Sequence, residues 1–247
     1  MSISLDEAVE LTRTGDVWVF RGRSVPDRAI QFTTNSPVNH VGMAVVLDDM
    51  PPLMWHAELG RSLPDLWSGT HQRGVQLHDL RDAVCVWANR YGQRAWLRQL
   101  DPPADGEMER AVLRTIARLD GTPFPSTAQL AWRWVRGRVP TLPLPGRLSA
   151  LPLPGRPAPR RNPATPANPG TPATPASPAG SAGERDRALE TAYCAEVVAV
   201  TYEAMGLLPA GRRPNWYDPG RFWSGDDLGL AAGARLGSEI EVRVPPR

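Results

Sequence analysis

The sequence predicts an α+β fold in which an antiparallel sheet packs against helices. Short apolar runs bounded by turn residues recur between residues 17 and 88, as is typical of strands. Apolar residues then recur at helical spacing over 105–119, with glutamate and arginine on the other side, and again after residue 184. The two kinds of periodicity indicate that strands and helices contribute to one core.

A proline-rich segment interrupts this pattern. Thirteen of the 27 prolines lie between residues 139 and 181, and the segment has hardly any aliphatic residues beyond its first stretch. Such a segment cannot bury enough apolar surface to offset the entropy lost on ordering. We therefore expect a disordered insertion at 139–183 within one domain, whose two parts are residues 1–138 and 184–247.

Most of the expected strands lie in the first part of the domain. They are the runs 17–20, 38–46, 53–59, 75–80 and 83–88. The turn at 48–52 is short, so the second and third runs are predicted to pair as an antiparallel hairpin. Residues 239–244 alternate apolar with charged side chains, which predicts a last strand at or near the edge of the same sheet.

Helices are expected on both sides of the insertion. The expected helical segments are 1–13, 26–32, 105–119, 126–138 and 184–208. The first is short and amphipathic, and it lacks the cationic start and continuous apolar run of a signal peptide. No apolar stretch reaches the length that spans a bilayer. The sequence therefore predicts a cytoplasmic protein without a transmembrane segment.

Composition argues against several classes of function. The net charge is +2, and the arginine clusters are not interleaved with aromatic residues, so nucleic acid is not an expected partner. Two cysteines do not make a disulfide framework and fit a reducing compartment. The histidines lack the spacing of metal ligands, and Cys85 stands alone, so neither a metal nor another cofactor is predicted.

Cys194 is the strongest candidate for chemistry. Thr191 is a good N-cap residue, which would place Cys194 in the first turn of a helix. Backbone N–H groups and the positive end of the helix dipole favour the thiolate there, so we expect the pKa of Cys194 to lie well below the roughly 8.5 of a free cysteine. Taken alone, a cysteine on an apolar helix face is more often a small buried hydrophobe.

A nucleophilic cysteine needs a base and a polar group that orients the base. His40, in the run 38–46, is the leading candidate for the base, although a lone strand histidine is more often a hydrogen-bonded structural residue. Glu58 lies on the other strand of the predicted hairpin, spaced so that it could lie beside His40 across the ladder. The alternative is that Glu58 faces the surface.

Together these residues resemble a known family. The order Gly15-Asp16, Asn39-His40-Val41-Gly42, Glu58 and Tyr193-Cys194-Ala195-Glu196-Val197-Val198 resembles the permuted papain-like amidases of the NlpC superfamily, in the YiiX/YaeF-like group. In papain-like enzymes generally the cysteine precedes the histidine, whereas here it follows. The resemblance implies a permuted papain-like fold, with Cys194 as nucleophile, His40 as base and Glu58 as the orienting residue. Ala195, where serine is common, and the long insertion depart from the family pattern.

The resemblance further implies a hydrolase that acts on an amide or ester through a thioester acyl-enzyme. A peptide, a cell-wall fragment or a lipid-linked acyl group would each suit this chemistry, and nothing in the sequence selects among them. Two alternatives stay open: an acyltransferase with a lipid or amine acceptor, and a non-catalytic binding module of the same fold. Residues 139–183 would then serve either as a spacer or as a docking peptide for a partner's proline-reading domain.

Overall fold

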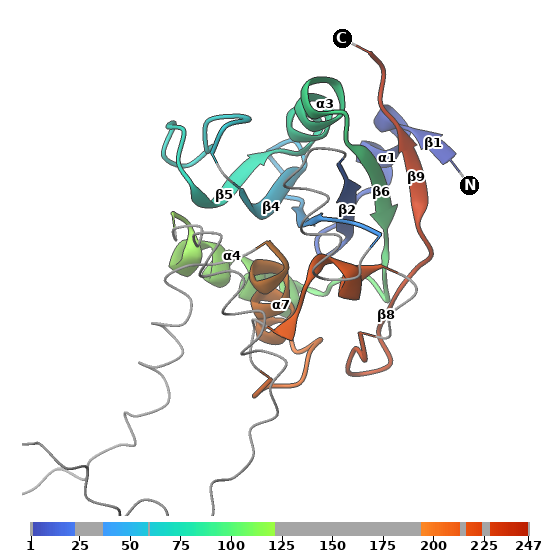
Figure 1. Cartoon of the computed structure of the whole chain (residues 1–247). Coiled ribbons are helices and arrows are strands. Elements are labelled where there is room, and N and C mark those ends of the chain that lie inside the picture. Colours follow the sequence, from blue (N-terminus) through green and yellow to red (C-terminus); the bar gives the residue numbers. More distant parts are fainter. Residues whose placement is uncertain are drawn as a thin grey trace, which may run out of the picture.

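The computed structural model describes residues 2–22, 37–58, 60–121, 194–212, 216–223 and 228–246. The predicted helices 26–32 and 126–138, the insertion at 139–183 and the predicted N-cap residue Thr191 lie outside these residues. The described part of the chain is a mixed α/β structure in which a mostly antiparallel sheet packs against four helices (Figure 1). An antiparallel sheet packed against helices is therefore confirmed.

The main sheet has seven strands in the order β1-β9-β6-β2-β3-β4-β5. These are β1 (Ser2–Ser4), β2 (Val17–Arg21), β3 (His40–Val45), β4 (Leu53–Glu58), β5 (Gly74–Asp79), β6 (Arg94–Arg98) and β9 (Ile240–Arg243). Neighbouring strands are antiparallel except β1 and β9, which are parallel. A second sheet pairs β7 (Leu100–Asp101) with β8 (Arg235–Leu236). The last long strand thus lies next to the edge, as predicted, and β3 and β4 form the predicted hairpin.

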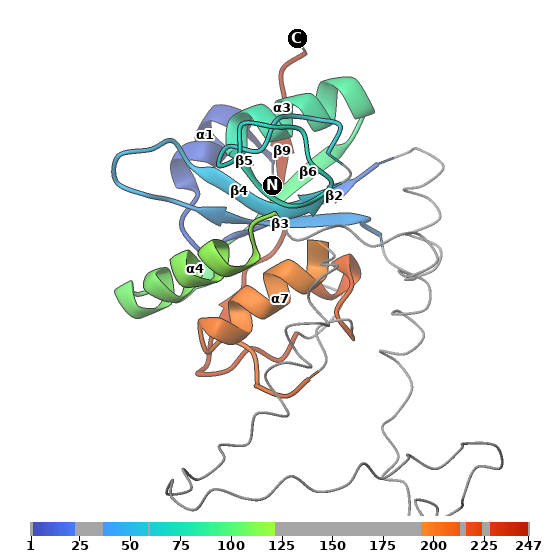
Figure 2. The same ribbon diagram turned by 90° about the vertical axis from the view of Figure 1, so that its left-hand side faces the viewer.

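Helices cover both faces of the main sheet (Figure 2). On one side lie α1 (Leu5–Leu11) and α3 (Leu80–Tyr91), and on the other lie α4 (Gly106–Leu119) and α7 (Cys194–Ala204). The short 3-10 helix η3 (Pro219–Phe222) packs on the α7 side. We refer to these two sides as the α3 face and the α7 face. None of the described helices is both long enough and apolar enough to cross a bilayer.

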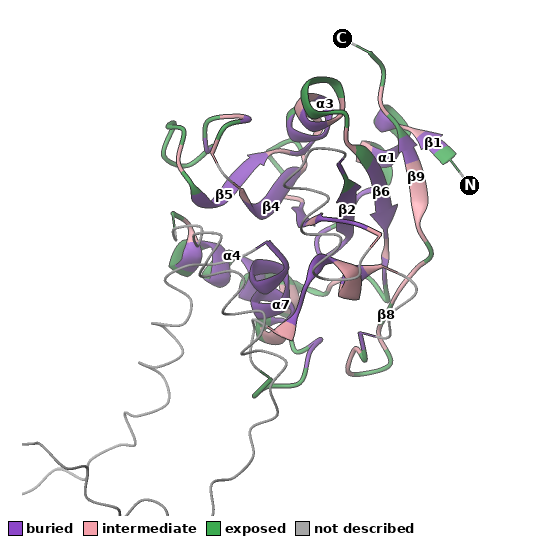
Figure 3. Cartoon of the chain, in the orientation of Figure 1, coloured by how far each residue is buried: buried purple, intermediate pink, exposed green. Residues whose placement is uncertain are grey.

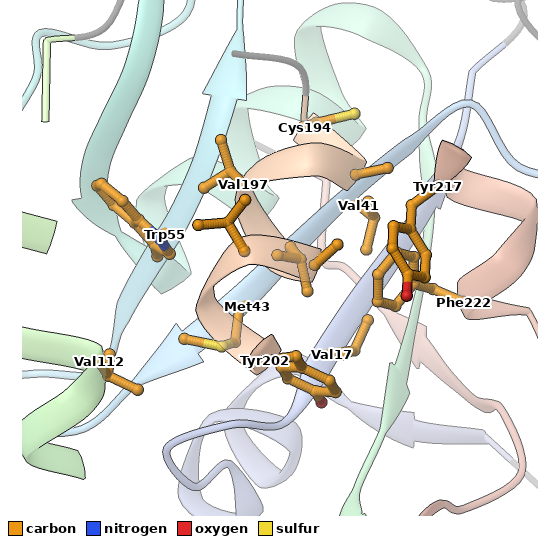
Figure 4. Close-up of a cluster of buried hydrophobic side chains, with 14 of the residues drawn as sticks. Val17, Val41, Met43, Trp55, Val112, Cys194, Val197, Tyr202, Tyr217 and Phe222 are labelled. Atoms are coloured by element: carbon orange, nitrogen blue, oxygen red, sulfur yellow. The ribbon is translucent and has the colours of Figure 1, made fainter. Parts of the chain in front are cut away.

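Strand alternation divides the core between these two faces. On the α7 face, Val41 and Met43 of β3 and Trp55 of β4 pack against Val197 and Val198 of α7 (Figure 4). The α3 face buries Trp18, Phe20, Ala44, Met54, Leu80, Val84 and Trp87. Both layers lie inside the molecule, whereas the loops at its periphery are largely exposed (Figure 3). Successive residues of β3 and β4 therefore enter different cores.

A capping residue determines where the helix predicted at 105–119 begins. The carboxylate of Asp105 accepts hydrogen bonds from the backbone N–H groups of Glu107 and Met108, both at 2.9 Å. These bonds satisfy donors that have no partner within the helix. Helix α4 accordingly starts at Gly106 and ends at Leu119, in agreement with the prediction.

The strand expected at 83–88 is wrong, because these residues lie in helix α3. The carboxylate of Asp79 accepts a hydrogen bond from the Asp82 N–H at 2.9 Å and caps the helix, and Gly92 ends it in the left-handed conformation, with φ of 64°. The side chains that α3 buries are Leu80, Ala83, Val84, Cys85 and Trp87. A short apolar run does not distinguish a strand from a buried helix segment. Here the capping residues Asp79 and Gly92 favour the helix.

Two strands of the main sheet were not predicted. β1 occupies residues 2–4, so the helix expected at 1–13 is shorter than predicted and begins after Ser4, whose hydroxyl accepts from the Glu7 N–H at 3.2 Å. β6 has an arginine at each end, Arg94 and Arg98, so its apolar run is only three residues long and too short to predict a strand. Both strands extend the sheet on the side away from β4.

Candidate active site

Cys194 is the first residue of α7, and its sulfur lies at the N-terminal end of that helix (Figure 4). Only 1% of the residue is exposed, and it belongs to the apolar cluster of the α7 face together with Val41 and Val197. Backbone hydrogen bonds from Val41, Ala195 and Cys194 itself reach the sulfur. The structure therefore places this cysteine at a helix start, among the N–H donors that the sequence indicated.

Burial nevertheless outweighs these donors. It raises the pKa of Cys194 to about 12, and the backbone hydrogen bonds, which lower the pKa, do not compensate. The expectation of a lowered pKa was therefore wrong, because it considered the helix start without the apolar side chains around it. In this structure Cys194 is a protonated thiol at neutral pH.

The sulfur meets Val41 where the pairing of β3 with β4 stops. Their ladder runs from Val45–Leu53 to Met43–Trp55, whereas β4 stays paired with β5 as far as Glu58. The Val41 backbone lies beyond the end of the β3–β4 ladder and hydrogen-bonds to the sulfur of Cys194. The candidate nucleophile therefore lies where β3 has parted from β4 but is still paired with β2. Extended in the same register, the ladder would set His40 opposite Glu58, as the sequence predicted, but it ends three residues before His40.

His40, the first residue of β3, points to the α3 face. Its ring lies against Phe20, His56 and Trp87, with centroid separations of 5.8, 5.3 and 5.0 Å. The residue is half-buried, and its buried Nε2 has no hydrogen-bond partner among the described residues. Burial lowers the pKa of His40 to about 3, with a smaller contribution from His78, so the ring is neutral. The burial that keeps the ring neutral also opposes its protonation, so the ring can take up a proton only in a less buried arrangement.

Glu58 is partly buried, and no hydrogen bond joins it to His40 among the described residues. Its Oε1 accepts hydrogen bonds from the Ser62 Oγ at 2.6 Å and the Ser62 N–H at 3.3 Å, and its Oε2 accepts from the Trp87 Nε1 at 3.2 Å. Because the Trp87 ring lies against His40, the carboxylate is connected to the histidine through the indole. The Trp87 indole is therefore in contact with both the Glu58 carboxylate and the His40 ring.

The structure adds two histidines that the sequence did not single out. The Nε2 of His56 lies 3.0 Å from the Nδ1 of His78, whose Nε2 lies 3.1 Å from the Gln76 Oε1. The His56 ring contacts both His40 and Trp87, and its buried Nδ1 has no partner among the residues described. Burial lowers the pKa of both His56 and His78. A signal was available, since His56, Gln76 and His78 alternate with apolar residues on strands that are otherwise buried.

The predicted site residues thus form two groups. Cys194 lies with Val41 on the α7 face, and His40 lies with Glu58, Trp87 and the added histidines on the α3 face. No hydrogen bond joins Cys194 to His40 in the part of the chain that the structure describes, although Val41 directly follows His40 in the chain. In the same part of the chain, no group of three or more His, Cys, Asp or Glu side chains is arranged to hold a metal ion.

A comparison with solved structures finds a distant similarity of backbone. No protein-family model matches the chain, and no curated protein sequence matches it. A solved structure with a similar backbone is that of the metalloprotein YiiX of Escherichia coli O157:H7, a DUF1105 protein, with a TM-score of 0.42 and 17% sequence identity. YiiX is a distant structural neighbour. The alignment covers 78% of this chain and 65% of YiiX, so the chain matches slightly less than two thirds of that protein.

Proposed function

We propose that the protein is a cysteine hydrolase that cleaves an amide or ester through an acyl-enzyme on Cys194. One observation carries the proposal: the sulfur lies at a helix start with backbone hydrogen bonds from Ala195 and from Val41. Val41 directly follows His40 in the chain, and the Nε2 of His40 has no partner among the described residues. Backbone donors in this arrangement can stabilise the negative charge of a thiolate or of a tetrahedral oxyanion. The resemblance to permuted papain-like amidases supports the same assignment.

The protonation states require His40 to act as a base during the reaction. Cys194 is a thiol and His40 is neutral, so the proton of the thiol passes to the imidazole as the sulfur attacks the carbonyl carbon. The imidazolium then protonates the leaving amine or alcohol, which leaves a thioester. His40 next takes a proton from water, the hydroxide attacks the thioester, and the thiol is restored. Each turnover consumes one water and returns both residues to their neutral forms.

This mechanism requires the backbone at the end of β3 to move, because His40 projects from the α3 face and Cys194 lies on the α7 face, and side-chain rotation alone cannot carry the ring across the strand. The residue stands at the end of β3, is half-buried, and has no hydrogen bond holding its Nε2. The sulfur also has to be uncovered, because it is almost completely buried. We therefore propose that the described arrangement is a resting form, and that substrate binding opens the end of the β3–β4 hairpin.

Trapping the acyl-enzyme tests the proposal, and the second cysteine supplies a matched control. With a p-nitrophenyl ester as the probe, intact-mass spectrometry of the wild-type protein is expected to show one acyl adduct. Cys194→Ala should lose the adduct and nitrophenol release, whereas Cys85→Ala, which removes a buried sulfur from α3, should keep both. His40→Ala should slow adduct formation by about 10²-fold or more, the usual effect of losing a general base. Equal adduct formation by Cys194→Ala and wild type would exclude Cys194 as the nucleophile.

A non-catalytic binding module is the second candidate, and one observation favours it. A fully buried cysteine with a raised pKa has the properties of an inert packing residue. Absence of any adduct on the wild-type protein with a range of amide and ester probes would support this alternative. An acyltransferase would form the same adduct as a hydrolase, but an added amine or lipid alcohol would then appear in the product in place of water.

A further inference from the structure

We propose that the loop between β4 and β5, residues 60–73, docks the protein on an anionic lipid surface, with Trp67 entering the headgroup region. The loop projects from the sheet beside α3 (Figure 1), and most of its residues are exposed (Figure 3). The proposal depends only on this surface and is independent of any chemistry at Cys194.

Trp67 is the most exposed large hydrophobic side chain in the described part of the chain, at 76%, and the neighbouring Leu66 is 46% exposed. Tryptophan is highly buried on average in folded proteins, so an indole presented to water beside a leucine indicates a contact surface. The indole has an apolar body and one polar N–H group, a combination that suits the boundary between lipid headgroups and acyl chains.

Hydrogen bonds fix the backbone of the turn that carries Trp67. Asp65 is fully buried, and its carboxylate accepts hydrogen bonds from the Ser68 N–H at 2.7 Å and the Leu77 N–H at 2.9 Å. The Leu66 N–H donates to the Leu77 carbonyl at 2.8 Å, which joins the loop to β5. These bonds on both sides of Trp67 hold the turn in place, so the indole is presented to solvent by a defined backbone.

The charged residues of the loop favour binding to an anionic lipid surface. Arg61 is exposed near the start of the loop, and the loop's single carboxylate, Asp65, is buried and fully engaged. The tip from Leu66 to Thr70 carries no charged side chain. An apolar tip with an exposed arginine beside it matches a bilayer that contains anionic lipids, where the arginine adds to the attraction. A protein partner is less well matched, since a stable interface covers about 800 Å² on each side, far more than one indole and one leucine.

The base of the loop is joined to the α3 face. Ser62 donates to the carboxylate of Glu58, and the Tyr91 hydroxyl of α3 donates to the Arg61 carbonyl at 3.1 Å. A loop held at its base and at its turn can transmit an orientation to the whole domain when its tip is fixed. Docking through Trp67 would therefore also set the orientation of the α3 face relative to the lipid surface.

Co-sedimentation of the full-length protein with vesicles tests the proposal. The wild type should pellet with phosphatidylcholine vesicles that contain phosphatidylserine, and less with phosphatidylcholine alone or at raised salt. Trp67→Ala should weaken binding about tenfold, the effect of withdrawing one large apolar side chain. Trp67→Phe should restore part of the binding. Arg61→Gln should weaken binding to the anionic vesicles about fivefold and leave binding to the neutral vesicles unchanged.

Two variants serve as controls. Leu113→Ala removes a side chain of α4 that is 44% exposed and lies far from this loop in the sequence, and it should bind as the wild type does. Cys194→Ala should also bind unchanged, which separates docking from the proposed hydrolysis. A wild-type protein that stays in the supernatant with anionic vesicles would overturn the proposal and leave a protein pocket as the partner of Trp67. Equal binding by Trp67→Ala and wild type would overturn it as well.

Discussion

The two faces of the central sheet are built from the same strands but differ in chemistry. The α7 face is almost wholly apolar, with Met43 and Trp55 packed against valines of α7. The α3 face mixes apolar side chains with a buried polar group formed by His40, His56 and His78. Alternation within β3 and β4 sends neighbouring residues to opposite faces, so one ladder supports both environments.

The two faces contribute differently to the stability of the protein, and the candidate site residues are distributed over both. A dry apolar face gives stability in proportion to the area it buries, whereas buried neutral histidines oppose protonation and give little stability of their own. The candidate nucleophile belongs to the first face and the candidate base to the second. They are linked through the chain, because the sulfur contacts the backbone of Val41 and His40 is the residue before it. The proposed reaction would therefore need a rearrangement that brings the two groups together.

The largest expected effect comes from breaking the α7 face. Trp55 is completely buried, and its Nε1 donates to the Thr201 Oγ1 of α7 at 3.1 Å. Trp55→Ala should lower the free energy of unfolding by about 3–5 kcal/mol, through lost burial and a cavity. Urea denaturation measures it. The matched control is Trp67→Ala, which should change the same quantity by less than about 0.5 kcal/mol because Trp67 is exposed; similar losses in both variants would contradict the contrast.

Acid should weaken the α3 face more than the α7 face. Burial lowers the pKa of His40 to about 3 and lowers those of His56 and His78, whereas an unfolded histidine binds a proton near about pH 6.5. As the pH falls below that value the unfolded chain takes up protons that the folded chain refuses, so stability present above about pH 6.5 is lost on acidification.

Two carboxyl groups oppose this trend. Burial raises the pKa of Asp16 and of Asp120 to about 6, so between about pH 6 and 4 the folded state retains protons that the unfolded state releases. Between about pH 6.5 and 6 the three histidines act before these carboxyl groups titrate, so the free energy of unfolding falls there, and below about pH 6 the two aspartates oppose the loss. His78→Gln should reduce the slope of unfolding free energy against pH by about 1.4 kcal/mol per pH unit. Urea titrations at a series of pH values measure it, and an unchanged slope would show that His78 is not buried and neutral.

Glu58 should matter through Trp87 and not through charge alone. Glu58→Ala leaves the Trp87 Nε1 and the Ser62 hydroxyl without their acceptor, and it should cost about 1–3 kcal/mol of unfolding free energy. Glu58→Gln keeps one carbonyl acceptor and should cost less. The near-ultraviolet circular dichroism of the indoles should change with Glu58→Ala and stay close to wild type with Glu58→Gln. Indistinguishable stability of both variants and wild type would place Glu58 outside this contact network.

The smallest expected signal is the reactivity of Cys194 in the absence of substrate. The sulfur is buried and its pKa is raised to about 12, so iodoacetamide should label it slowly at neutral pH and faster as the pH rises. Cys85 is buried as well and should also label slowly until the protein is unfolded. Mass-spectrometric labelling at each cysteine measures both rates. Rapid labelling of Cys194 near pH 7 would show that the resting form is open at this site.

Much of the fold follows from local sequence patterns. The runs that became β2, β3, β4 and β5 are apolar and end at turn residues, and the short turn between β3 and β4 permits only an antiparallel pair. Helix α4 was recognisable because its apolar residues recur at helical spacing after Asp105. Helix α3 was missed because its apolar run is short and its capping residues, Asp79 and Gly92, were not considered together. A helix or strand can thus be predicted from the sequence where the spacing of its apolar residues and the residues at its two ends indicate the same element.

The sequence by itself determined the candidate residues Cys194, His40 and Glu58, and it placed the cysteine at a helix start, because residue type and local spacing are properties of the chain. Only the tertiary structure decided their environment. Packing of valines from α7 and β3 around the sulfur raises its pKa, although the helix start alone favours the thiolate. Strand register and alternation place the His40 ring against His56 and Trp87. They also place the Glu58 carboxylate where it accepts hydrogen bonds from Ser62 and Trp87. Desolvation and side-chain partners arise from residues distant in the chain, so they exist only once the sheet has formed.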